Sequence, residues 1–284
     1  MRNFISEDDI EQAILSKLKA EPFKYDILIC DASPDKRDVL PDGTGRNSKK
    51  ECILPDVMLT SLKRINPTIE ENKIKEIVKT LRQDYTGTDI VDTNYKLYRQ
   101  IRNNIKITVR RNGKEDFDFV KLIDFEHPEK NTFTAVSQMW IQGKVYYRRP
   151  DILIFVNGMP IVFIELKNSI VKIEEAYNKN LQDYLRDIPN LFAFNQICVL
   201  SNGLVTKLGA FKATYDYFFE WLKVDSEMEK LDREAILAAD NVKDSSVRYF
   251  VEGLLNKDRL IDYIENFILF ENQRTKIIAK NHQY

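Results

Sequence analysis

The chain of 284 residues is poor in histidine and carries almost no net charge, with 43 basic against 44 acidic side chains. His127 lies in a polar segment and His282 lies three residues from the end, so a catalytic triad with a histidine base is not expected. Nucleases built on a histidine and a metal are disfavoured for the same reason. The balanced charge excludes a general basic field, so any nucleic-acid binding must come from a local patch.

Cysteine and long apolar runs are also scarce. Three widely spaced cysteines form no CxxC pair, which argues against a disulfide framework or a zinc finger and fits a reducing cytoplasm. No apolar run approaches the ~20 residues that a membrane helix needs. The N-terminus is acidic and lacks the apolar core of a secretion signal. We therefore expect a cytoplasmic protein without a membrane partner.

A nucleotide-binding P-loop is missing as well. The motif GxxxxGK[ST] needs Ser or Thr after its Gly-Lys pair. The Gly-Lys pairs at 113–114 and 143–144 are followed by Glu115 and Val145 instead. The chain itself is not expected to bind or hydrolyse ATP.

Hydrophobic periodicity predicts a mixed α/β domain over residues 1–225 and a helical segment over 226–284. Residues 33–50 are polar and contain Pro and Gly, which predicts a mobile loop. Helices are predicted at 7–19, 55–65, 70–84 and 173–187. Strands are predicted near 105–109, 117–125, 133–140 and 145–149, on both sides of Asn157-Gly158, and at 196–200 and 204–208.

The chemistry-bearing stretch starts at Asp151, continues through 13 residues and ends at Glu165-Leu166-Lys167. Because successive side chains of a strand point to opposite faces, Glu165 and Lys167 share a face. A carboxylate and a lysine on an otherwise apolar strand are costly to bury unless they are paired or bind a metal. The stretch therefore marks a candidate site.

The register of the hairpin decides whether Asp151 joins this face. A strict two-residue turn at Asn157-Gly158 would pair Asp151 with Ile164, on the wrong face. A three-residue loop over 157–159, or one β-bulge, would pair Asp151 with Glu165 instead. We therefore predict one of these two irregularities.

Two carboxylates on adjacent strands indicate a site for a hard divalent cation, best matched by Mg²⁺. Asp151 and Glu165 would bind the metal. Lys167 would hold or activate the attacking water and stabilise the transition state of phosphodiester hydrolysis. The pattern is short, and a surface salt bridge between Glu165 and Lys167 is the alternative.

The residues around the motif carry a family resemblance. The stretch RRPDILIFVNGMPIVFIELKNS resembles the nuclease motif of the restriction (R) subunit of type I restriction-modification enzymes, a PD-(D/E)xK nuclease. The likeness covers most of the chain from about residue 50. It continues in FVKLIDFEHPEKNTFTAVSQM, AYNKNLQDYLRDIPNLFAFNQICVLSNG, FFEW, RLIDYIENFILFE and KNHQY. The resemblance implies a restriction-endonuclease-like mixed sheet flanked by helices, with a C-terminal helical segment and with Asp151, Glu165 and Lys167 as catalytic residues.

The family also carries a QxxxY pattern, needed for cleavage, on the helix after the motif. Tyr184 matches the tyrosine, but Asn180 stands four residues before it and Gln182 two residues before it. The local sequence AYNKNLQDY is one residue longer than the usual form. Asn180 and Gln182 both stay candidates for the role of the family glutamine. Glu7 and Glu11 match an acidic pair often seen on the first helix.

Candidate DNA contacts must be local. Arg148 and Arg149 adjoin the motif and could contact phosphate. A run of seven cations without an acidic residue among them could also hold the phosphate backbone, although a solvated face is the commoner explanation of such a run. The run comprises Lys96, Arg99, Arg102, Lys106, Arg110, Arg111 and Lys114.

The resemblance further implies a superfamily 2 motor after this region, so that ATP would serve only the full-length subunit. The expected function is Mg²⁺-dependent cleavage of double-stranded DNA without sequence specificity, after ATP-driven translocation. Methyltransferase (M) and specificity (S) subunits would be partners. Two alternatives stay open: a non-catalytic nuclease-fold module that couples the motor to DNA or to partner subunits, and a stand-alone nuclease of another PD-(D/E)xK branch.

Overall fold

A seven-stranded mixed sheet forms the centre of the computed structural model, which describes residues 4–222, 224, 234, 236, 245–280 and 283. Its strand order is β1-β4-β7-β8-β9-β10-β11. β1 runs parallel to β4 and β8 parallel to β9, and the other neighbours are antiparallel. The strands are β1 (Asp26–Ile29), β4 (Phe133–Ser137), β7 (Ile152–Val156), β8 (Met159–Leu166), β9 (Ile197–Ser201), β10 (Thr206–Gly209) and β11 (Phe219–Glu220).

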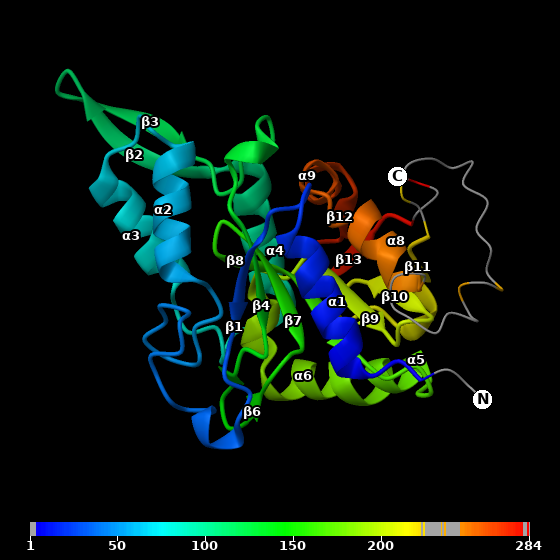
Figure 1. The fold of residues 1–284 in the computed structure, drawn as a ribbon. Helices are drawn as coiled ribbons and strands as arrows, with labels where there is room; N and C mark the ends of the chain where they lie inside the picture. Colours follow the sequence, from blue (N-terminus) through cyan, green and yellow to red (C-terminus); the bar gives the residue numbers. More distant parts are fainter. Residues whose placement is uncertain are drawn as a thin grey trace.

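Helices cover the sheet, so the fold is of the predicted α/β kind. In Figure 1, α1 crosses the front of the sheet and α4 lies behind it. Within the described part of the chain, no helix has both the length and the apolar character needed to cross a membrane. The helices are α1 (Glu7–Lys19), α2 (Pro55–Ile65), α3 (Glu71–Leu81), α4 (Ile90–Asn103), α5 (Ile173–Glu175), α6 (Gln182–Asp187), α8 (Ser246–Gly253) and α9 (Lys257–Asn266), and a π-helical turn (Ala176–Leu181) joins α5 to α6.

The described residues also form three two-stranded hairpins. They are β2 (Ile105–Arg111) with β3 (Lys114–Val120), β5 (Ile141–Gln142) with β6 (Tyr147–Arg148), and β12 (Ile268–Glu271) with β13 (Thr275–Ile278). Figure 1 shows the β2–β3 hairpin extending away from the sheet.

The first helix begins where its sequence predicts. The Ser6 hydroxyl accepts the amide N–H of Asp9 at 3.1 Å, and the Asp9 carboxylate accepts the amide N–H of Ser6 at 3.0 Å. This reciprocal capping box satisfies two N–H groups that a helix start leaves free. The apolar stripe of this helix is buried, with Ile10 and Leu18 both at 0% exposure. α1 therefore packs its apolar face on the sheet, and Glu7 in its acidic first turn lies beside Lys167 at the end of β8.

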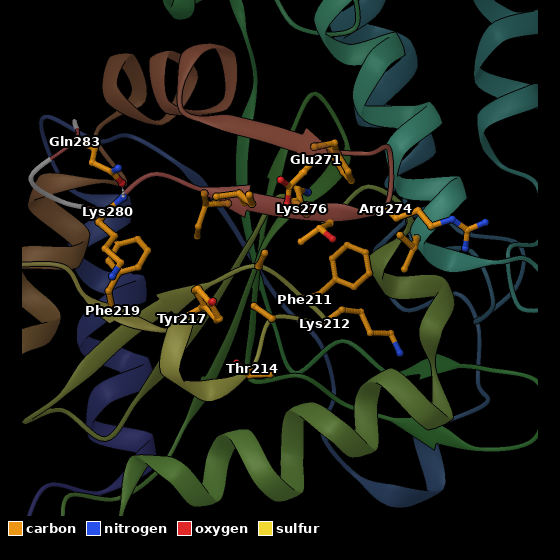
Figure 2. A pocket seen from close by; sticks show the side chains of 17 residues that line it. Phe211, Lys212, Thr214, Tyr217, Phe219, Glu271, Arg274, Lys276, Lys280 and Gln283 are labelled. Atoms are coloured by element: carbon orange, nitrogen blue, oxygen red, sulfur yellow. Dashed lines mark hydrogen bonds between the residues drawn. The ribbon is translucent and has the colours of Figure 1, made fainter.

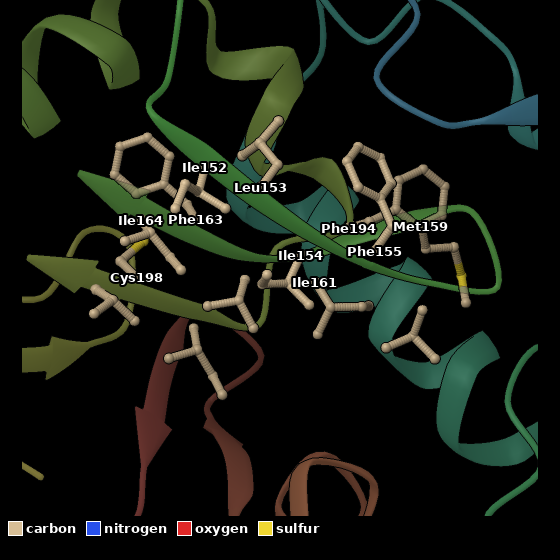
Figure 3. Packing of buried hydrophobic residues seen from close by; sticks show 14 of the residues in the cluster. Ile152, Leu153, Ile154, Phe155, Met159, Ile161, Phe163, Ile164, Phe194 and Cys198 are labelled. Carbon is tan, nitrogen blue, oxygen red and sulfur yellow. The ribbon is translucent and has the colours of Figure 1, made fainter. Parts of the chain in front are cut away.

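Strands β7 and β8 form the centre of the core. Every residue of both strands is buried, which explains their nearly continuous apolar sequence. Figure 3 shows the packing around this pair, with Phe155, Phe163 and Phe194 among the large side chains. The Glu165 carboxylate near the end of β8 is therefore surrounded by closely packed apolar side chains.

The expected helical segment over 226–284 is only partly helical. α8 and α9 are helices, but 268–278 form the β12–β13 hairpin. Burial alternates along both strands, a period of two that marks a strand, and Asn272 and Gln273 reverse the chain at positive φ. Most of 223–244, and 281, 282 and 284 from the C-terminal KNHQY, lie outside the described residues.

The expected mobile loop at 33–50 is irregular, but ion pairs tie its second half to the fold. Asp42 Oδ2 accepts hydrogen bonds from Arg46 Nη2 at 2.7 Å and from Lys49 Nζ at 2.6 Å. The Arg46 side chain is fully buried and also donates to the carbonyl of Trp140. The polar composition of this loop reflects buried ion pairs as well as solvent exposure.

Candidate active site

A β-bulge places the two acidic residues of the motif opposite each other. Val156 pairs with Met159 around the turn, and the register then shifts by one residue between Ile154 and Phe155. Beyond the shift Ile152 pairs with Ile164, so that the next pair along the hairpin is Asp151 with Glu165. The predicted irregularity is confirmed, and it is the bulge rather than the longer loop.

The turn of this hairpin is fixed by contacts with the rest of the fold. Asn157 and Gly158 have φ values of 49° and 79°, the left-handed pair that a tight two-residue hairpin turn requires. The Asn157 amide donates to the carbonyl of Leu122 at 2.9 Å and to Asn131 Oδ1 at 2.7 Å. These contacts hold the hairpin in one position, and therefore hold the register that its far end needs.

The three predicted catalytic residues come together at the end of β8. The Asp151 carboxylate accepts the amide N–H of Leu166 at 2.7 Å. Lys167 Nζ donates to Glu165 Oε1 at 2.9 Å and to the Leu166 carbonyl at 2.7 Å. Glu165 is only 2% exposed, so its pair with Lys167 is not a surface salt bridge.

Burial dominates the electrostatics of these groups. Burial raises the pKa of Asp151 well above its usual value, and the charge of Glu165 adds to this effect. Burial also raises the pKa of Glu165, against the opposing influence of Lys167 and Tyr184. Burial lowers the pKa of Lys167, but Glu165, Glu7 and Asp151 outweigh this effect and raise it overall. Two carboxylates thus repel each other in a low-dielectric site, and a bound cation would relieve the repulsion.

The residues present fit a hydrated divalent cation. Glu165 Oε2 is buried and has no hydrogen-bond partner, which leaves one carboxylate oxygen available at the site. In the part of the chain that the structure describes, no three His, Cys, Asp or Glu side chains form a metal-ligating group. Two carboxylates with water or phosphate at the other positions are a common arrangement for Mg²⁺. The donor set therefore suits Mg²⁺ better than a metal that needs a full protein cage.

The acidic pair on α1 reaches the same end of the sheet. Glu7 Oε1 lies 3.8 Å from Lys167 Nζ. Glu11 is buried and accepts hydrogen bonds from the Ser137 hydroxyl at 2.7 Å and from the side-chain amide of Gln138. The positive φ of Gln138, which sets it apart from an ordinary strand residue, cannot be read from its sequence. Ser137 and Gln138 were therefore not among the residues that the sequence motif indicated.

The two arginines beside the motif are held by other parts of the protein. Arg148 Nη2 lies 2.5 Å from Asp187 Oδ2 and 3.3 Å from Asp183 Oδ2. Arg149 donates to the carbonyl of Ala32, and its guanidinium lies 5.2 Å from the Trp140 ring centroid. Both side chains thus support the walls of the site, and their role in phosphate binding stays a prediction.

A π-helical turn lies within the stretch AYNKNLQDY. The turn spans Ala176–Leu181, and α6 follows it with Tyr184 as its third residue. Such turns arise from one inserted residue in an α-helix and often lie at functional sites. Asn180 is half-buried and Gln182 is exposed. Tyr184 is 6% exposed, packs edge-on against Phe163 and donates to the Arg149 carbonyl at 2.9 Å.

The run of seven cations splits between α4 and the β2–β3 hairpin. Several members are already paired, because Lys96 lies 2.7 Å from Asp92 and Arg102 lies 3.4 Å from Glu265. Lys106 Nζ lies 3.6 Å from the centroid of the Phe117 ring. These pairs reduce the free positive charge of the run, and its contact with DNA stays a prediction.

A cavity of about 630 Å³ lies elsewhere in the molecule, between the β12–β13 hairpin and the segment that follows β10. Figure 2 shows Phe211, Lys212, Arg274 and Lys276 among its lining side chains. This cavity adjoins the end of β10 at Gly209, whereas the Lys167 amide bonds to Ser201 at the opposite end of β9. None of the candidate site residues lines it, so the cavity is separate from the carboxylate site.

Comparisons with known proteins agree on one family. A family model described as the type I restriction enzyme R protein N terminus matches residues 4–217. The chain is 30% identical over 291 residues to the endonuclease subunit of the type I restriction enzyme HindI from Haemophilus influenzae, covering 99% of this chain and 26% of that protein.

Two further relatives come from other organisms. A putative type I restriction enzyme MjaIXP endonuclease subunit from Methanocaldococcus jannaschii is 30% identical over 295 residues, covering 97% of this chain and 26% of that protein. The EcoprrI endonuclease subunit from Escherichia coli is 28% identical over 173 residues, covering 58% of this chain and 50% of that protein. The chain spans about a quarter of the length of the first two relatives. It belongs to the family of type I restriction enzyme R protein N termini.

Proposed function

We propose that this chain is the metal-dependent endonuclease domain of a type I restriction enzyme R subunit, with a PD-(D/E)xK site that hydrolyses DNA phosphodiester bonds. The observation that carries the proposal is the buried, unpartnered oxygen of Glu165 beside Asp151 and Lys167. An oxygen that is buried without a partner costs about 1–3 kcal/mol unless a ligand satisfies it.

The roles follow from the chemistry of each group. Asp151 and Glu165 would hold Mg²⁺, which when bound would polarise the scissile phosphodiester and lower the pKa of a bound water. Lys167 carries only donors, so it would hold the attacking water and stabilise negative charge on the phosphoryl oxygens. The apolar strands behind the site exclude bulk water, which strengthens these electrostatic interactions.

The wider function rests on the relatives, whose names describe type I restriction enzyme endonuclease subunits. We propose that the full-length subunit cuts double-stranded DNA without reading its sequence, after ATP-driven translocation by a motor outside this chain. M and S subunits would supply methylation and sequence recognition. Asn180, Gln182, Tyr184, Arg148 and Arg149 would support DNA binding or cleavage.

Metal binding tests the proposal most directly. Titration calorimetry with Mg²⁺ compares the wild-type chain with Asp151→Asn and Glu165→Gln, which keep the side-chain shapes and remove one negative charge each. Asp124→Asn is the matched control, because its carboxylate is also buried but pairs with Lys121 away from the site. We expect the wild type and the control to bind, and both site variants to lose binding.

Duplex DNA then separates two explanations of a negative result. If the wild type binds no metal alone, the titration is repeated with a short duplex whose phosphates can complete the coordination shell. Absence of binding in both conditions would contradict a metal-dependent nuclease and favour a non-catalytic module that couples the motor to DNA.

A further inference from the structure

Gln138 occupies a special position beside the candidate metal site. It follows β4, where the register places it opposite Asp151, and its amide N–H donates to the Asp151 carbonyl at 2.9 Å. Its φ is 56°, in the left-handed region that a side chain other than glycine adopts at a cost. Such conformations persist where the surrounding structure enforces them, and they concentrate at functional sites.

Glu11 fixes the orientation of the Gln138 side chain. The Glu11 carboxylate is 7% exposed and accepts hydrogen bonds from Gln138 Nε2 and the Ser137 hydroxyl. A carboxylate accepts from the nitrogen of an amide and repels its oxygen, so the amide cannot exchange its two ends here. Gln138 Oε1 must therefore point away from Glu11.

The amide oxygen of Gln138 is buried and has no hydrogen-bond partner. Glu165 Oε2, at the same end of the sheet, is also buried and has no hydrogen-bond partner. Oxygen acceptors thus exceed the free donors around Asp151. Lys167 and Ser137 already donate to Glu165, to the Leu166 carbonyl and to Glu11, and the Tyr184 hydroxyl beside Glu165 donates to the Arg149 carbonyl. A hydrated divalent cation would correct this imbalance, since its waters donate hydrogen bonds and its charge offsets the carboxylates.

We propose that Gln138 is a further positioning residue of the metal site, whose Oε1, oriented by Glu11, accepts a hydrogen bond from a hydration water of the cation held by Asp151 and Glu165. This inference rests on the proposed metal-dependent function. In this arrangement, Asp151 and Glu165 of the β7–β8 hairpin would bind the cation directly. Gln138, oriented from α1, would bind one of the cation's water molecules. Gln138 acts through the water and needs no contact with DNA.

Gln138→Met tests the proposal, because methionine is unbranched and similar in length but has no amide. Loss of an outer-shell partner typically costs 10–100-fold in metal affinity. We expect calorimetry with Mn²⁺ to show at least tenfold weaker binding in Gln138→Met. Thr134→Val is the matched control, since Thr134 Oγ1 is another buried, unpartnered oxygen of β4 and lies at the strand's other end. Its metal affinity should equal that of the wild type.

An exchange of the two partners guards against a variant that merely misfolds. The double variant Glu11→Gln with Gln138→Glu keeps the total charge and rebuilds the amide–carboxylate pair in reverse. It should bind Mn²⁺ within about threefold of the wild type, whereas Glu11→Gln alone should bind more weakly. Thermal unfolding without metal reports whether each variant is folded.

The outcomes separate this inference from the proposed function. Wild-type affinity in a folded Gln138→Met overturns the inference alone, provided that Asp151→Asn and Glu165→Gln abolish binding. If the wild type binds no metal with or without duplex DNA, the proposed function fails first. Recovery in the exchanged double variant, together with weakening in Gln138→Met, supports the role of the pair.

Discussion

The amide N–H of Leu166 donates a hydrogen bond of 2.7 Å to Asp151 Oδ2, which joins the first acidic residue of the motif to the backbone between the other two functional residues. The strand that carries Glu165 and Lys167 therefore also orients Asp151. A shift of β8 along β7 would displace all three groups together. The geometry of the site therefore depends on the stability of this hairpin.

Removal of the Lys167 ammonium should separate catalysis from metal binding. Positioned groups of this kind contribute about 10²–10⁴-fold to rate, so we expect Lys167→Met to slow DNA cleavage by at least 100-fold in the assembled full-length enzyme. Mg²⁺ binding should persist, because both carboxylates remain. The measurement is single-turnover cleavage of duplex DNA alongside calorimetry.

The control for this experiment is Lys257→Met. Lys257 Nζ lies 5.3 Å from the centroid of the Phe133 ring, at the end of β4 that is far from the site, and its loss should leave cleavage unchanged. Unchanged cleavage in Lys167→Met would contradict the catalytic role of this lysine.

The turn at Gly158 should be far less tolerant of a side chain than the turn at Gly113. Both glycines have positive φ, 79° and 77°, so alanine meets the same backbone penalty of about 1–2 kcal/mol at each. A Cβ at Gly158 would lie 2.5 Å from the Leu54 carbonyl oxygen, whereas nothing lies within 4 Å of a Cβ at Gly113. We expect Gly158→Ala to lower the free energy of unfolding by about 2 kcal/mol more than Gly113→Ala, because overpacking adds to the strain. Urea denaturation measures the difference, and equal losses would refute the close packing of this turn.

The Asp42 cluster should make stability sensitive to acid. Burial alone would raise the pKa of Asp42, but Arg46, Lys49 and Thr44 hold it well below its usual range. Because the folded pKa is lower than the unfolded value of about 3.9, this contribution is complete above pH ~4 and is lost as the pH falls further. Asp42→Asn should lower the free energy of unfolding by about 3 kcal/mol near pH 7, since it leaves two buried cations without their partner.

The same variant should show a weaker loss of stability below pH 4 than the wild type, as measured by urea denaturation across the acid range. Asp35→Asn, in the exposed part of the loop, is the control and should behave as the wild type. A parallel pH profile in Asp42→Asn and wild type would show that the cluster does not titrate with folding.

Lys276 should make stability rise with pH in the alkaline range as well. Its ammonium is buried against Asn94 Oδ1 at 3.1 Å, the Asn195 carbonyl at 2.6 Å and Gln196 Oε1 at 2.6 Å, and burial lowers its pKa well below the usual value. The unfolded chain then binds more protons below pH ~10.4, so this contribution is complete above that pH and falls as the pH is lowered.

Denaturation between pH 8 and pH 10 can detect this dependence. Wild-type stability should rise with pH by up to about 1.4 kcal/mol per unit from this group, and Lys276→Met should remove the rise. Lys280→Met, at an exposed position, should keep it. A rise that survives in Lys276→Met would show that another group is responsible.

Local sequence rules predicted the parts of the molecule that depend on near neighbours. The start of the helix at Glu7 and the strands on both sides of Asn157-Gly158 are set within a few residues. The positions of Asp151, Glu165 and the Asn157-Gly158 turn predicted either a longer loop or a bulge, and the structure has the bulge. These features were predictable because the chain around them already contains their partners.

Features that depend on distant partners were not predictable in the same way. Glu11 and Gln138 are 127 residues apart, and Asn94 and Lys276 are 182 residues apart. The β12–β13 hairpin was taken for helix because its apolar residues also fit a helical stripe. In each case the packing of separate segments decided between local structures that the sequence alone left equally acceptable.

The bulge between Asp151 and Glu165 also limits how the gene can change. Insertion or deletion of one residue within this hairpin would turn one carboxylate to the opposite side of the sheet, whereas two residues would restore it. Length variation among functional relatives should therefore come in even steps, unless a second irregularity compensates. Insertion or deletion of a single codon in this hairpin should therefore abolish activity as fully as the loss of a catalytic group.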